Sequence, residues 1–60
     1  MMPLPLFHVR LKIDGIIMDI AVMANGMGAA VMTAFLTIGY EAEKIGYHPE
    51  DVKLISVRVE

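Results

Sequence analysis

Residues 7–13, FHVRLKI, alternate strictly between apolar and polar side chains, and Asp14-Gly15 follows at once. Alternation with a period of two is the pattern of a β-strand that buries one face. Asp-Gly between two apolar runs favours a two-residue type I′ turn, because both central residues of that turn need a positive φ. The sequence therefore predicts a β-hairpin, with residues 16–24 as its second strand.

A two-residue turn also determines which residues of the two strands face each other. Arg10 then lies opposite Asp19, and opposite charges across a strand pair contribute roughly 0.2–1 kcal/mol. This pairing supports the predicted register. In the same register, one face of the hairpin is wholly apolar and consists of Phe7, Val9, Leu11, Ile13, Ile16, Met18, Ile20 and Val22.

A helix is predicted after the second strand, over about residues 27–45. Asn25 is expected to be its N-cap, because the Asn side chain accepts a hydrogen bond from a free amide of the first turn. Gly46 is expected to end the helix in the left-handed conformation, and Pro49 prevents its continuation. Residues 53–59 alternate again and predict a third strand, with Ile55, Val57 and Val59 facing inward and Leu54, Ser56 and Arg58 facing outward.

These elements predict an α+β fold with the order ββαβ and residues 1–60 in a single domain. The expected strands cover residues 6–13, 16–24 and 53–59. Crossover connections are right-handed by strong preference, and the third strand lies most simply beside the first. We therefore expect a three-stranded antiparallel sheet in the order 2-1-3, with the helix packed on one of its faces.

The predicted helix is apolar on two sides. At 100° per residue, one stripe is expected to pack on the sheet and contains Val31, Phe35, Ile38, Ala42 and Ile45, flanked by Met27 and Ala34. The opposite side is also apolar and contains Ala29, Met32, Leu36 and Tyr40. A helix that is apolar all round is normally buried on both sides. A second protein surface is therefore expected to cover this opposite side.

The size of the chain favours the same conclusion. A chain of 60 residues buries only about 60% of its unfolded surface on folding. Yet 57% of the residues are hydrophobic, above the usual 45–50% or so. The chain has no cysteine, so disulfides cannot supply the missing stability, and self-association is the remaining means.

The sequence thus predicts a homo-oligomer, most simply a dimer, whose interface is formed by Ala29, Met32, Leu36 and Tyr40. The second strand is an alternative interface, because it lies at an edge of the expected sheet and unpaired edges attract other strands. Its contributing residues would be Ile17, Ala21 and Met23. The sequence does not decide between the two.

Charge limits the choice of partner. The formal net charge is −2 and the isoelectric point is about 5.5, which argues against non-specific nucleic-acid binding. A basic stripe of Arg10, Lys12, Lys53 and Arg58 keeps nucleic-acid binding as an alternative, although the outward positions of the strands lack the aromatic residues that stack on RNA bases. An acidic group is available for contact with a basic protein surface and contains Glu41, Glu43, Glu50 and Asp51.

No catalytic, cofactor or metal site is predicted. His8 and His48 have no sequence partner that would form a nucleophile and base pair, and Thr33 and Thr37 are expected to bond to helix carbonyls. The Gly26-Met27-Gly28 sequence lies between a strand and a helix, as phosphate loops do. It lacks the further residues that such loops need.

The predicted function is therefore that of a small non-enzymatic protein-binding or inhibitor module that self-associates. By analogy of size and layout, a more specific alternative is an anti-CRISPR-like inhibitor, carried by a phage or mobile element, of a nucleic-acid-binding host complex. A cytoplasmic location is expected, since the absence of cysteine suits a reducing compartment. A single membrane span is a further alternative, because Asp19 is the only charge between Gly15 and Gly39. The two predicted turns within that stretch argue against a span.

Overall fold

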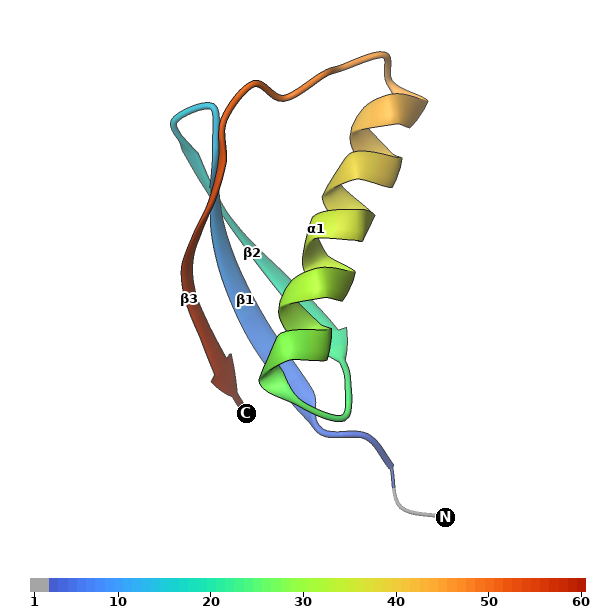
Figure 1. Cartoon of the computed structure of the whole chain (residues 1–60), viewed down its shortest axis with the longest axis vertical. Coiled ribbons are helices and arrows are strands. Elements are labelled where there is room, and N and C mark those ends of the chain that lie inside the picture. The colour runs from blue at the N-terminus through green and yellow to red at the C-terminus, as the bar shows by residue number, and fades with distance from the viewer. Residues whose placement is uncertain (1–2) are drawn as a thin grey trace.

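The computed structural model describes residues 3–60, so the first two residues of the expected domain lie outside it. Its elements are β1 (Leu6–Ile13), β2 (Ile16–Met23), α1 (Met27–Lys44) and β3 (Val52–Val59). The strands form an antiparallel sheet in the order β2-β1-β3, and α1 packs on one face of it (Figure 1). The predicted ββαβ fold and strand order are confirmed.

The hairpin has the predicted turn and register. Asp14 and Gly15 have φ values of 48° and 87°, as a type I′ turn requires. Arg10 pairs with Asp19 across the strands, and its Nε and Nη2 donate hydrogen bonds of 2.8 and 3.2 Å to the two carboxylate oxygens. The Asp14-Gly15 turn thus accounts for the pairing of the two strands.

The two ends of α1 differ in how well the sequence predicted them. Gly26 is the N-cap and makes no side-chain hydrogen bond, so the prediction of Asn25 as N-cap is wrong. The carbonyl of Gly26 accepts the amide of Ala30 at 3.0 Å, which places the cap one residue later than expected. At the C-terminal end, Gly46 has a φ of 73°, as predicted.

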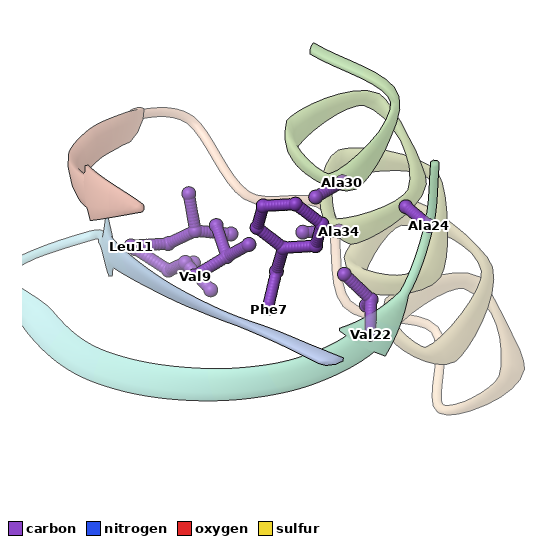
Figure 2. Packing of buried hydrophobic residues seen from close by; sticks show 8 residues of the cluster. Phe7, Val9, Leu11, Val22, Ala24, Ala30 and Ala34 are labelled. Carbon is purple, nitrogen blue, oxygen red and sulfur yellow. The ribbon is translucent and has the colours of Figure 1, made fainter. Parts of the chain in front are cut away.

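The core lies between α1 and the concave face of the sheet (Figure 2). Val9 and Leu11 at its centre are completely buried. The helix contributes mainly small side chains, since its buried residues are Ala30, Ala34 and Ala42. Small residues allow the helix backbone to approach the large side chains of β1 closely. The core also contains Phe7, Ile13, Val22 and Ala24, with Ile20, Ile38, Val52 and Val57 partly buried against it.

The predicted inward stripe of α1 is therefore partly wrong. Ala42 is buried and Val31 and Ile38 are partly buried, whereas Phe35 is 36% exposed and is not part of the core. Ile45 is 80% exposed, because it is the C-cap residue and follows the last helical residue, Lys44. Ala30 and Ala34 are completely buried and lie beside the stripe that hydrophobicity alone selects.

A bulge in the pairing of β1 with β3 changes which side chains of β3 face the helix. Ser56 pairs with Arg10 and Leu54 with Leu11, so Ile55 has no partner in the ladder. Such a bulge inserts one residue and inverts the alternation beyond it. Leu54 pairs with Leu11, whose side chain is buried, so the predicted outward position of Leu54 is wrong. Ile55, predicted to face inward, is 46% exposed and is not part of the core. Val57 and Val59, on the other side of the bulge, pair with Val9 and Phe7.

The long stretch of low charge is divided between two elements. Most of the residues between Gly15 and Gly39 belong to β2 and to the first part of α1. None of the helices formed by residues 3–60 has the length and apolar character needed to cross a membrane.

Candidate functional site

The side of α1 that points away from the sheet is a continuous apolar surface. We call Ala29, Met32, Leu36 and Tyr40 the outer face of α1; all four are exposed. Met32, Leu36 and Tyr40 are 66%, 68% and 62% exposed. Contiguous apolar surface of this kind marks interaction sites more often than it occurs by chance on a monomer. The structure thus brings together the four residues predicted as an interface.

One cation lies at the C-terminal end of this face. Lys44 Nζ is 4.7 Å from the centroid of the Tyr40 ring and 3.8 Å from Glu41 Oε1. A cation over an aromatic ring is worth about 0.5–1 kcal/mol at an exposed site. The polar end of α1 therefore borders the outer face at Tyr40, while Met32 and Leu36 form its apolar centre.

The free edge of β2 is a second exposed surface. β2 is an outer strand of the sheet, and Ile17, Ala21 and Met23 are all exposed along it. Ile16 and Met18 are exposed as well. The residues of the alternative predicted interface therefore also lie together, on a different element from the outer face of α1.

The face of the sheet opposite α1 carries several polar pairs. His8 Nε2 lies 2.9 Å from Glu60 Oε1, and Lys53 Nζ lies 3.7 Å from Asp51 Oδ2. The hydrogen bond from Arg10 lowers the pKa of Asp19. A shallow hollow of about 260 Å³ lies among these groups, lined by His8, Arg10, Asp19, Ser56 and Arg58. Because Arg10 and Lys53 lie beside carboxylates, the predicted basic stripe has a weaker positive field than its four charges suggest.

Asp14 connects the hairpin turn to the loop that precedes β3. Its carboxylate accepts hydrogen bonds from the Tyr47 hydroxyl and from the amides of Glu50 and Asp51, at 3.1 and 2.8 Å. The Tyr47 hydrogen bond is the main reason that the pKa of Asp14 is lowered. The same hydrogen bond raises the pKa of Tyr47. The arrangement fixes the loop against the hairpin.

The predicted acidic group is distributed over two segments. Glu41 and Glu43 lie in the last turns of α1, whereas Glu50 and Asp51 precede β3. The amides of the latter two are bound to Asp14. An apolar cavity of about 260 Å³ lies between the segments, below the C-terminal end of α1. Its lining comprises Ile13, Met18, Ile38, Glu41, Ala42, Ile45, Tyr47 and Pro49.

The side chains of His8 and Thr37 have structural partners. His8 contacts Glu60, and the Thr37 hydroxyl donates to the Thr33 carbonyl at 2.8 Å. The latter bond confirms the prediction for Thr37. Within residues 3–60, no group of three or more His, Cys, Asp or Glu side chains is placed to hold a metal ion.

Sequence reasoning missed two of these contacts. One is the hydrogen bond between Tyr47 and Asp14, which are 33 positions apart in the sequence. The other is the contact between His8 and Glu60, which are 52 positions apart. The strand order did contain a signal for His8, because the end of β3 lies beside the start of β1.

Comparison with known proteins adds no functional evidence. No family model, no curated protein and no solved structure matches this chain. Its function is therefore inferred from the surfaces described above.

Proposed function

We propose that the protein is a non-enzymatic protein-binding module that self-associates through the outer face of α1. The observation that carries the proposal is the exposure of Met32, Leu36 and Tyr40 on one side of a single helix. These three large side chains lie opposite the buried alanines of the same helix. If a second copy covers them, each Å² of apolar surface removed from water stabilises the contact by about 25 cal/mol.

The accessible surface of the chain supports this proposal. It amounts to 4489 Å², whereas a folded monomer of 6.6 kDa is expected to expose about 3900 Å². The excess of about 600 Å² is close to the roughly 800 Å² that each partner buries in an interface of standard size. One further contact with a protein of similar shape would bring the exposed area to an ordinary value.

The decisive experiment compares two substitutions that place the same charge on different sides of α1. Leu36→Glu puts a carboxylate in the centre of the outer face, and Thr37→Glu puts one on the adjacent exposed polar side. Loss of one buried Leu side chain costs about 1.5–3 kcal/mol, so we expect Leu36→Glu to weaken self-association by more than about tenfold. Thr37→Glu is expected to leave it unchanged.

The mass of each protein is measured by size-exclusion chromatography with light scattering, and folding is checked by circular dichroism. A lower mass for Leu36→Glu, but not for Thr37→Glu, supports the proposal. A folded Leu36→Glu protein with the wild-type mass at every concentration contradicts it. Leu36→Gln replaces the Glu variant if the latter fails to fold, because it removes the apolar side chain without adding a charge.

A further inference from the structure

We infer that the free edge of β2 pairs in antiparallel orientation with β2 of a second copy, which joins the two sheets into one. This contact uses a different surface from the outer face of α1, so it goes beyond the proposed function. Four observations support it: the character of the two sheet edges, the direction of the free backbone groups, the register that the side chains allow, and the exposed area.

The two edges of the sheet differ in how well they are protected. Natural proteins protect edge strands with bulges, with proline or with charged side chains, especially lysine. β3 has a bulge in its pairing, at Ile55, and carries Lys53 and Arg58. β2 pairs with β1 without interruption over its whole length and has no proline, lysine or arginine. Its one charged residue, Asp19, is paired with Arg10 of the same copy. The β2 edge is therefore less protected against pairing with another chain than the β3 edge.

The backbone of β2 offers a regular set of free groups at this edge. Ile13 and Ile16 close the two-residue turn, and such a closing pair exchanges both backbone hydrogen bonds. The even-numbered residues of β2 then point their amides towards β1, as the bond from the Ala24 amide to the Pro5 carbonyl shows. The remaining residues direct their N–H and C=O groups away from β1, and these are Ile17, Asp19, Ala21 and Met23.

Charge and the extent of backbone pairing favour one register for the pair. Residues that face each other in an antiparallel pair lie on the same side of the sheet. A register centred on Asp19 would place two carboxylates opposite each other, which is destabilising. A register centred on Ile20 instead places Asp19 opposite Ala21 of the second copy and Ile17 opposite Met23 of the second copy. All free backbone groups of β2 are then bonded, and Asp19 keeps its own partner, Arg10.

Exposed apolar side chains along β2 also favour this contact. Ile17 and Met23 are 58% and 60% exposed, and the contact between them would occur twice in the symmetric pair. The two-fold axis of such a pair is perpendicular to the sheet, so both α1 helices lie on the same face of a six-stranded sheet. A copy that uses both this edge and the outer face of α1 contacts two neighbours, which gives an assembly larger than a dimer.

The test uses a proline on the free edge. The amide of Ala21 points away from β1, so Ala21→Pro removes no hydrogen bond within the fold but blocks a strand from pairing there. Ala21→Thr is the matched control, because it changes the side chain and keeps the amide. Met23→Lys is a second variant that places a charge on the same edge and serves if the proline variant does not fold.

Hydrogen exchange of individual amides, followed by NMR at high protein concentration, gives the direct readout. We expect the amides of Ile17, Asp19 and Met23 to exchange at least about tenfold faster in Ala21→Pro than in wild type and Ala21→Thr. The amides of Met18 and Val22, which point towards β1, are the internal reference and should stay protected in all three proteins. Equal exchange of the three edge amides in wild type and Ala21→Pro would overturn the inference.

The same measurement separates this inference from the proposed function. In Leu36→Glu the edge amides are expected to remain protected, because that substitution lies on α1. Leu36→Glu and Ala21→Pro should each leave a dimer, and the double variant should be a monomer. If Ala21→Pro has the wild-type mass and wild-type exchange while Leu36→Glu is a monomer, the edge contact is refuted and the proposed function stands.

Discussion

At the hairpin end of the molecule, the side chain of Asp14 links the turn to the loop that precedes β3. It adopts the positive φ that the turn requires, and its carboxylate binds Tyr47 and two amides of the following loop. Its own amide donates to the Asp51 carbonyl at 2.8 Å. The residue thus connects the turn that the sequence predicted to a loop whose path the sequence did not predict.

This arrangement predicts a pH dependence of stability. The pKa of Asp14 is lowered from its ordinary value of 3.8, so its contribution is fully present above pH 3.8 and is lost as the pH falls through the folded-state value. We expect Asp14→Asn to be less stable than wild type near neutral pH and to lose less stability on acidification. Urea unfolding at neutral pH and at about pH 2–3 measures both effects.

Glu43→Gln is a suitable control, because it also removes one negative charge but from an exposed position on α1. Asp19, whose pKa is lowered too, accounts for part of the pH dependence that remains in Asp14→Asn. An Asp14→Asn protein whose stability falls with acid as steeply as that of wild type would contradict the role given to Asp14.

At the residue scale, the sequence predicted contacts between neighbours in a known register and missed contacts across the fold. Arg10 and Asp19 were predicted because a two-residue turn leaves one register for the hairpin. Tyr47 was missed as a partner of Asp14, since the position of its hydroxyl depends on the course of residues 45–51. Asn25 has a side chain suited to an N-cap, but the carbonyl that accepts the first hydrogen bond of the helix belongs to Gly26.

At the scale of elements, the C-terminal end of α1 is the most fully specified feature. The amides of Gly46 and Tyr47 donate to the carbonyls of Glu43 and Ala42 at 3.1 and 2.9 Å. These two bonds form a Schellman motif, in which the residue after the C-cap adopts the left-handed conformation. Gly46 has this conformation without the steric cost that a Cβ would add.

We therefore expect Gly46→Ala to lower the free energy of unfolding by about 1 kcal/mol. Gly46→Asn should cost less, because asparagine tolerates a positive φ better than alanine. Urea unfolding at one fixed protein concentration measures both variants. Equal stability of Gly46→Ala and wild type would show that this residue does not hold the left-handed conformation in solution.

At this scale the sequence predicted the elements correctly but assigned some of their side chains to the wrong face. Alternation along β3 cannot reveal a bulge, because Leu54 and Ile55 are both apolar and either parity fits the sequence. The helical wheel of α1 gives weight to large residues such as Phe35, whereas the structure uses Ala30 and Ala34 for the closest approach to the sheet. Packing geometry, and not hydrophobicity alone, decides both cases.

At the scale of the whole molecule, residues 3–60 form one helix packed on one sheet, with extents of 38 × 22 × 14 Å. Its radius of gyration is 11.9 Å, larger than the roughly 10.4 Å expected for a compact domain of this length. A two-layer molecule this thin has little interior, so many of its apolar residues remain on the surface. The number and periodicity of those residues were evident from the sequence, but the partner that covers them was not.

The most direct test of self-association is the mass of the wild-type protein in detergent-free buffer, measured by light scattering over a dilution series. We predict a mass of at least twice 6.6 kDa at high concentration, with dissociation on dilution. A mass of 6.6 kDa at every concentration would contradict both proposed contacts and would mean that the outer face of α1 and the β2 edge are exposed to solvent in the free protein.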